Sequence, residues 1–234
     1  MARLARLALP GYPHLVSHRA GARDLIVDDE DARRLLQELR QALLDADVAL
    51  HGYTLLPRGL WLLATPVDAG GLGRAMQSIG RRFVRWVNDR RAEHGGIFSG
   101  RYRAAPIEPD AGSLRALAFV DTMPLRAIPG VTLDQYSWSS CRVHLGLASD
   151  PHLGTLPAYW ALGNTPFDRQ AAYRRLLDTG VGADETKRFA QALAGGWVVG
   201  SPGFVRQIEA QCSRRPQPAR PGRPRRGAAP PPRG

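Results

Sequence analysis

The spacing of apolar residues in the first half of the chain switches between the two-residue period of a strand and the 3.6-residue period of a helix. The run at 14–19 predicts a short strand. An acidic stretch at 28–31 suits the positive end of a helix dipole, and the residues after it form one apolar stripe: Leu35, Leu36, Leu39 and Leu43. These features predict an amphipathic helix from Asp28 to about Asp45.

Two apolar runs, at 48–56 and 60–65, predict strands joined by a hairpin-like connection at Pro57-Arg58-Gly59. A second amphipathic helix is expected at 72–91, followed by a strand at 104–107 and a helix at 113–122 that stops near Pro124. This order is typical of the split βαβ, ferredoxin-like sheet, so the predicted fold class is α+β. Beyond residue 155 the pattern is helical, at 168–177, 184–194 and 202–211.

Composition divides the chain into three parts. Residues 1–130 hold the predicted sheet domain, 131–212 a helical C-terminal extension, and 213–234 a tail with seven arginines, seven prolines and no acid. We expect the tail to be disordered, because it has too little apolar surface to offset the entropy of ordering. Two interpretations of it stay open, a phosphate-binding arm and a solvated terminus.

The net charge of the chain indicates the chemical class of its partner. The 32 Lys and Arg residues exceed the 21 Asp and Glu residues by 11, and Lys187 is the one lysine. Arginine favours planar, bidentate contacts with phosphate, which indicates an anionic partner and most simply nucleic acid.

Two cysteines exclude a disulfide scaffold and a Cys-rich zinc site. No apolar run reaches the roughly 20 residues of a membrane helix, and the N-terminus does not read as a signal peptide, so we expect a soluble, cytoplasmic protein without a membrane partner.

Seven segments resemble, in order and spacing, the REP-associated tyrosine transposases, which are single-strand DNA transposases of the HUH-nuclease kind. They are GYPHLVSHR (11–19), HGYTLLPRGLWLL (51–63), GRRFVRWVN (80–88), FSGRYR (98–103), FVDTMPLRA (119–127), YSWSS (136–140) and GWVVGSPGFVRQIE (196–209). The resemblance implies a ferredoxin-like fold and a hairpin-forming palindromic DNA substrate that is cut in single-stranded form. It also implies two histidines that hold Mg or Mn, and a tyrosine on a helix that attacks the phosphate.

The chemical positions of that family are changed in this chain. Its Pro-Asn-His-x-His pattern corresponds to residues 57–61, so Gly59 and Trp61 stand where the histidines would be. Its Tyr-Ile-x-x-Asn-Pro pattern corresponds to 119–124, so Phe119 replaces the nucleophile and Met123 the third ligand. Neither glycine nor an indole N–H ligates a cation, and a thioether is a poor partner for Mg or Mn. We therefore expect no intact catalytic site, no metal and no cofactor.

No other histidines in the sequence are spaced to replace the two missing metal ligands. His14 and His18 lie about 13 Å apart along one strand, too far to chelate one ion, and the remaining histidines stand alone. Trp61 has two interpretations: it fills the former metal pocket together with Phe119 and Met123 as an apolar plug, or it is a stacking platform for a base.

Binding does not need the lost groups. The candidate nucleic-acid contacts are Arg19, Arg23, Arg81, Arg82, Arg85, Arg101, Tyr102 and Arg103; for the helix arginines the alternative is a solvated face. The predicted function is a catalytically inactive transposase relative that binds single-stranded or hairpin palindromic DNA, as a monomer or a homodimer. Two alternatives are a DNA-nicking transposase that uses residues outside the family pattern, and a non-catalytic interaction partner of an intact homologue.

Overall fold

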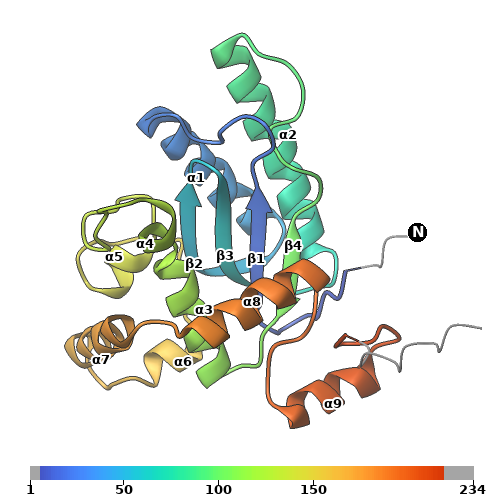
Figure 1. The fold of residues 1–234 in the computed structure, drawn as a ribbon, viewed down its shortest axis with the longest axis vertical. Coiled ribbons are helices and arrows are strands. Elements are labelled where there is room, and N and C mark those ends of the chain that lie inside the picture. Colours follow the sequence, from blue (N-terminus) through green and yellow to red (C-terminus); the bar gives the residue numbers. More distant parts are fainter. Residues whose placement is uncertain (1–5, 219–234) are drawn as a thin grey trace, which may run out of the picture.

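The computed structural model describes residues 6–218, and its centre is a four-stranded antiparallel sheet in the order β2-β3-β1-β4 (Figure 1). The strands are β1 (His14–Arg19), β2 (Val48–Leu56), β3 (Gly59–Pro66) and β4 (Arg103–Pro106). Two split βαβ units interleave to give this order, so β1 lies between β3 and β4. The predicted α+β, ferredoxin-like fold class is confirmed.

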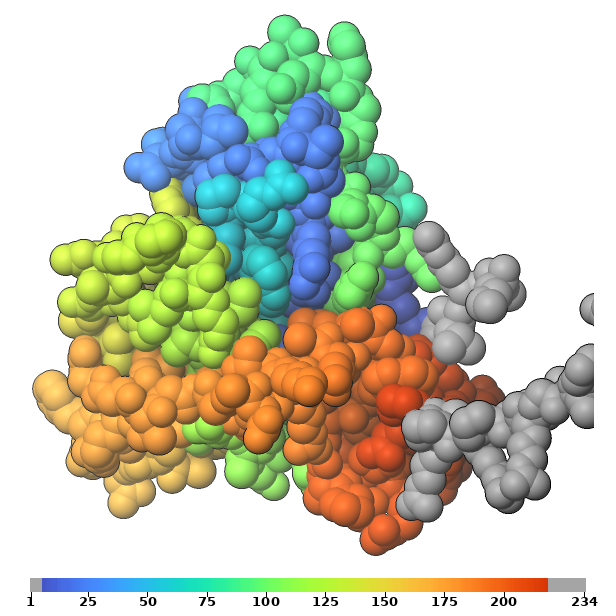
Figure 2. Space-filling model, viewed as in Figure 1, coloured from blue at the N-terminus to red at the C-terminus, as the bar shows by residue number. Residues whose placement is uncertain are grey.

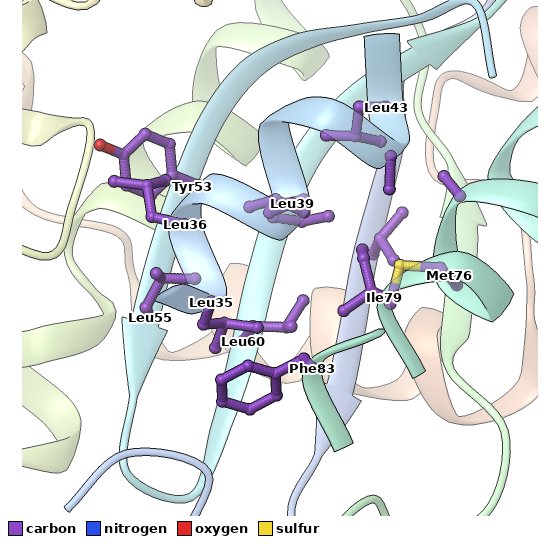
Figure 3. Packing of buried hydrophobic residues seen from close by; sticks show 14 of the residues in the cluster. Leu35, Leu36, Leu39, Leu43, Tyr53, Leu55, Leu60, Met76, Ile79 and Phe83 are labelled. Carbon is purple, nitrogen blue, oxygen red and sulfur yellow. The ribbon is translucent and has the colours of Figure 1, made fainter. Parts of the chain in front are cut away.

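Helices α1 (Asp29–Asp45) and α2 (Gly71–Arg91) cover one face of the sheet. The predicted leucine stripe of α1 packs on β2 and β3, and α2 adds Met76, Ile79 and Phe83 (Figure 3). Phe83 is fully buried, as the sequence predicted. Burial of such side chains contributes about 1.5–3 kcal/mol each, which makes this layer the main hydrophobic core.

The acidic start of α1 does more than complement the helix dipole. Asp28 caps the helix by accepting hydrogen bonds from the backbone N–H groups of Glu30 and Asp31. Arg90, near the end of α2, donates to Asp28 and Asp31, and Arg91 pairs with the same buried Asp31. The two helices are therefore joined by charge at one end as well as by apolar packing along their length.

The other face of the sheet is covered by α3 (Ala111–Asp121) and α8 (Ala183–Gly195) (Figure 1). Their apolar residues form a second core with Leu15, Leu63 and Ala105 of the strands. Side chains from both predicted regions, 1–130 and 131–212, belong to this core. The helical extension thus packs directly on the sheet and on α3.

The remaining helices are α4 (Met123–Ala127), α5 (Cys141–His144), α6 (Pro157–Trp160), α7 (Pro166–Thr179) and α9 (Pro202–Gln211). The sequence predicted α7, α8 and α9 within a few residues but not the three short helices. As predicted, α3 stops near Pro124, at Asp121. Pro124 itself lies in the first turn of α4, where a missing N–H costs nothing. None of the helices in residues 6–218 has the length and apolar content of a membrane span.

A small third core joins the two ends of the described chain. Leu7 and Leu9 pack with Val198 and with the apolar side of α9. Of the predicted tail, residues 213–218 continue along this region, where Pro216 is buried and its carbonyl accepts a hydrogen bond from Val198 N–H at 2.9 Å. The rest of the tail, 219–234, lies outside the described residues.

His14 anchors the N-terminal segment to the sheet. Its Nδ1 lies 2.8 Å from the Tyr12 carbonyl, to which it donates, and its Nε2 accepts from Leu9 N–H at 3.2 Å. This pattern requires a neutral ring, because a protonated Nε2 could not accept. Burial lowers the pKa of His14 to about 4.

We expect the free energy of unfolding to fall as the pH drops from 6.5 to 4. His14 takes up a proton near pH 6.5 in the unfolded chain but only near pH 4 in the folded chain. This difference in pKa lowers the free energy of unfolding by about 3 kcal/mol at and below pH 4. Urea unfolding at pH 7 and pH 4 checks this, with His14→Gln as the variant that cannot titrate. The variant should lose about 3 kcal/mol less than the wild type between the two pH values, and equal losses would contradict the account.

Candidate nucleic-acid interface

Gly59 and Trp61 lie at the start of β3, on the face of the sheet that packs against α3 and α8. Alternation along the strand places them on one side, as a pair of ligands would require. The indole of Trp61 lies over Gly59, however, and a Cβ at position 59 would be 3.2 Å from its Cη2 and 3.0 Å from the His18 carbonyl oxygen. The space that a side chain at 59 would use is already filled.

Phe119 lies on α3, only 4% exposed, in the same apolar cluster as Trp61, and Met123 packs against that cluster. Trp61, Phe119 and Met123 thus belong to one apolar cluster, and we refer to these three residues as the plug. Helix α8 adds a member that the sequence did not indicate, since the Phe189 ring centroid is 5.1 Å from that of Phe119. The guanidinium of Arg126 covers the ring of Phe119 at 5.1 Å and donates to Thr122 Oγ1 at 2.9 Å.

A buried polar network lies beneath this plug. Asp121, fully buried at the end of α3, accepts from Ser140 Oγ and Tyr173 OH, and Nδ1 of His144 lies at the same 2.7 Å from it. Burial and then Asp121 raise the pKa of Tyr173, which keeps its hydroxyl as a donor. In a catalytic triad the carboxylate contacts the histidine, and the histidine contacts the serine. Here the Asp121 carboxylate contacts Ser140, His144 and Tyr173 directly, and Ser140 is buried away from solvent. The network therefore holds α3, α5 and α7 together and is not a catalytic triad.

The sequence did not reveal this network because its members are far apart along the chain and His144 was expected to stand alone. The other lone histidines differ in their surroundings. His51 bonds Thr65 Oγ1 at 2.8 Å, His152 pairs with Asp150, and His94 is exposed. Within residues 6–218, no group of three or more His, Cys, Asp or Glu side chains is placed to hold a metal ion.

The three predicted arginines of α2 differ in their ionic partners. Arg82 lies 3.8 Å from Glu38 and 3.6 Å from Asp45, and Arg85 lies 3.8 Å from Asp89 on its own helix. Arg81 is exposed, without an acidic partner among the described residues. The neighbouring Trp86 is half-buried, stacked on Phe83 and flanked by the guanidinium groups of Arg34 and Arg90. Much of this surface is thus an intramolecular charge network.

Arg23 is also occupied within the molecule. Its guanidinium donates to Asn88 Oδ1 at 3.0 Å and to the Gly95 carbonyl at 2.9 Å, and it pairs with Glu93. It closes the loop after α2 onto the segment that follows β1. A phosphate would have to compete with three good acceptors for this side chain.

The other predicted contacts gather at one end of the sheet. Arg19 is the last residue of β1 and pairs with Gly59 of β3. Arg103 is the first residue of β4 and pairs with Ser17 of β1, whose partner on β3 is Trp61. Both arginines are therefore on the face that carries the family's chemical positions, and both are exposed. Figure 2 shows atoms of β1 and of the β2–β3 hairpin at the surface between α1 and α8, so this end of the face is open.

The loop that carries Arg101 and Tyr102 is held in place by His18. The His18 ring stacks on Phe98 at 3.9 Å, and its Nε2 donates to the Gly100 carbonyl at 3.1 Å. Burial lowers the pKa of His18, so the ring is neutral at pH 7. A neutral ring has one N–H group, and at Nε2 that group makes the hydrogen bond to the Gly100 carbonyl. We call Arg19, Arg101 and Arg103 the sheet-end arginines; no acidic side chain among the described residues pairs with them.

A groove of about 690 Å³ runs beside β4, which is an edge strand of the sheet. We call it the edge groove. Its lining contains small and apolar residues but no acid. It also contains arginines and two aromatic rings: Arg6, Arg101, Tyr102, Arg103, Trp197 and Arg214. Arg6 and Trp197 were not among the predicted contacts, and Arg214 was considered only as part of the tail. The fold brings all three residues close to β4.

The fold has a clear counterpart among solved structures. A structure of the REP-associated tyrosine transposase bound to a REP hairpin matches with a TM-score of 0.51, covering 66% of this chain and 92% of that one at 12% identity. The chain has the fold of a REP-associated tyrosine transposase. At this identity the likeness concerns the fold, and no family model or curated protein matches the sequence.

A protein from Deinococcus radiodurans R1 that is assigned to the transposases matches more weakly, with a TM-score of 0.36 and 17% identity over 46% of this chain and 85% of that one.

The side chains at the metal position expected from the sequence can be checked for their ability to bind a divalent cation. Gly59, Trp61 and Met123 offer no ligand for a hard divalent cation, and the indole fills the cradle at Gly59. The residues present do not fit Mg or Mn.

Removal of the buried charge at Asp121 should cost much more stability than removal of an exposed one. Asp121→Asn leaves the hydroxyls of Ser140 and Tyr173 and the His144 ring with a weaker acceptor, and we expect a loss of about 3 kcal/mol in the free energy of unfolding. The matched control is Asp178→Asn, at an exposed position of α7, with a change below about 0.5 kcal/mol. Similar effects of both substitutions on chemical unfolding would show that the network is not needed.

Proposed function

We propose that this chain binds single-stranded or hairpin DNA at the arginine-rich end of its sheet and does not cut it. The observation that carries the proposal is that the exposed Arg19 and Arg103 lie on the face that bears Gly59 and Trp61, with Arg101 beside Arg103 in the edge groove. Exposed guanidinium groups that lack an internal partner are available for bidentate contacts with phosphate oxygens.

The choice of DNA draws on fold and charge together. The solved structure that shares this fold was determined with a REP hairpin, and we extend that ligand class to this chain as part of the proposal. The net charge of +11 favours a polyanion in general. Charge by itself carries no sequence information, so the proposal concerns a class of ligand and not a particular target sequence.

The proposed lack of cleavage follows from the groups around the plug. Phe119 has no oxygen to attack a phosphate, and the plug offers no ligands for the cation that would polarise it. Two other tyrosines lie in family segments, but neither resembles an activated nucleophile. Burial raises the pKa of Tyr136 to about 12 and its hydroxyl donates to the Leu55 carbonyl, while the ring of Tyr102 is covered by Arg6 at 3.8 Å. These features argue against the nicking alternative.

Two double variants with equal loss of charge test the binding site. In Arg101→Gln with Arg103→Gln, we expect weaker binding of a labelled DNA hairpin, and a plot of log affinity against log salt whose slope is smaller by about 2. In Arg82→Gln with Arg85→Gln, whose arginines already pair with Glu38, Asp45 and Asp89, we expect little change. Fluorescence anisotropy at several salt concentrations measures both.

The comparison has two outcomes that would contradict the proposal. If the wild type does not bind the hairpin at low salt, the chain is not a DNA-binding protein of this kind. If the α2 double variant loses as much affinity and salt dependence as the sheet-end variant, binding depends on net charge and not on the sheet-end arginines.

A further inference from the structure

The side chain of His18 joins strand β1 to the loop that carries Arg101. Its ring is only 7% exposed, and alternation along the strand places it on the same face as Val16, under α1 and α2. We infer that His18 is a positioning residue for Arg101. The neutral ring holds the 98–102 loop in place, and uptake of a proton at Nδ1 releases the loop and weakens DNA binding. This inference rests on the proposed function and adds a means of regulating it by pH.

The ring of His18 contacts the loop on both sides of Arg101. Its Nε2–H donates to the Gly100 carbonyl at 3.1 Å, and the ring stacks on Phe98 with 3.9 Å between the centroids and 7° between the planes. An edge-to-face contact with Tyr102 has a centroid distance of 6.5 Å. Because Arg101 lies between Gly100 and Tyr102 in the chain, these contacts fix the stretch of backbone from which its side chain extends.

A backbone contact and a glycine turn complete the loop. Ser99 N–H donates to the Arg19 carbonyl at 2.9 Å, which joins the loop to the end of β1. Gly100 has a φ of +68°, in the left-handed region that favours glycine, so the loop turns at the residue whose carbonyl accepts from His18. Loss of that hydrogen bond and of the ring stack would therefore free the turn.

The second ring nitrogen of His18, Nδ1, is buried and has no hydrogen-bond partner. In the neutral ring this nitrogen carries a lone pair. A proton on Nδ1 would turn the lone pair into a donor and give the ring a positive charge. Burial of an unpaired charge costs far more free energy than burial of an unpaired lone pair. The closed loop therefore disfavours the protonated ring, whereas an open loop exposes Nδ1 to water.

The groups nearest to His18 do not relieve this cost. Arg6, whose guanidinium covers the Tyr102 ring at 3.8 Å, repels a second positive charge. Tyr102 stays neutral, because burial raises the pKa of its hydroxyl. From β3 the neighbour in register is the apolar Leu60. A proton on His18 would therefore meet one positive charge and two neutral side chains.

The buried acids of α1, which covers the same face of the sheet, are paired with arginines. Asp31 pairs with Arg91 of α2, and Glu38 pairs with Arg34 of its own helix at 2.6 Å. The sheet-end arginines beside the loop have the same sign as a protonated ring. Among residues 6–218, no carboxylate forms an ion pair with His18.

These surroundings determine the direction of the pH effect. Burial and, more weakly, Arg6 lower the pKa of His18 while the loop is closed. In an open loop the ring would titrate near the ordinary value of about 6.5. The open form therefore binds a proton at a pH where the closed form does not, and a change from pH 7 to pH 5 shifts the equilibrium toward the open form on the order of tenfold.

Hydrogen exchange at Ser99 measures loop opening directly, because the Arg19 carbonyl protects its N–H. From pH 7 to pH 5 we expect the protection factor of this amide, corrected for the intrinsic exchange rate, to fall about tenfold in the wild type. His18→Gln keeps a donor for Gly100 but cannot titrate, and its protection factor should stay within about twofold. His94→Gln, at an exposed histidine, is the matched control and should behave as the wild type.

Binding of a labelled DNA hairpin at pH 7 and pH 5, at constant ionic strength, tests the consequence for function. The exposed His94 and His152 gain charge at the lower pH, and this charge by itself favours a polyanion. We expect the wild type instead to lose affinity by about threefold, because fewer molecules hold Arg101 in place, and His18→Gln to lose none. His14 titrates in both proteins, so the difference between them isolates His18.

The outcomes separate the two proposals. If the wild type does not bind the hairpin at pH 7, the proposed function fails, and hydrogen exchange still decides whether His18 holds the loop. If Ser99 exchange or DNA affinity has the same pH dependence in the wild type and in His18→Gln, the inference is overturned and DNA binding at the sheet end stands. An NMR titration of the wild type needs no substitution, and a pKa of His18 at or above about 6.5 would also overturn the inference.

Discussion

Packing of α3 and α8 against the second face of the sheet is the interaction on which the rest of this structure depends. On that face Trp61, Phe119 and Phe189 belong to one apolar cluster. A tryptophan and two phenylalanines bury a large apolar area, so this cluster holds the C-terminal helices on the sheet. The indole of Trp61, which belongs to this packing, also fills the space beside Gly59, where the family resemblance predicts a metal ligand.

The buried polar residues next to the plug are joined by hydrogen bonds. Asp121 is two residues from Phe119 and satisfies two hydroxyls and a histidine ring in the interior. Such a network is costly if any member is removed, which constrains α3 to one position. The position of α3 in turn fixes the plug, and the open end of the face beside it carries arginines that no acid in the described chain neutralises.

Much of the architecture could be predicted from the sequence, because β1, β2, α1 and α2 have strong periodicity and clear end signals. The plug could be predicted too, since Gly59, Trp61 and Phe119 stand in recognisable segments. Long-range contacts could not be predicted: the partners of Arg23 and Arg82, the network around Asp121, and the presence of Arg6 and Trp197 in one groove all join residues 19 or more positions apart. Several arginines looked equivalent as sequence, and only the fold separates those that pair with acids from those that do not.

The most direct test of the account is a single reaction analysed on two gels. End-labelled hairpin DNA is incubated with the wild-type protein and either Mg²⁺ or Mn²⁺, and aliquots are run on a native gel and on a denaturing gel. We predict a shifted complex on the native gel, and on the denaturing gel DNA of unchanged length with no label attached to protein. A nicked product or a covalent protein–DNA adduct would contradict the central claim that this transposase fold binds DNA and does not cut it.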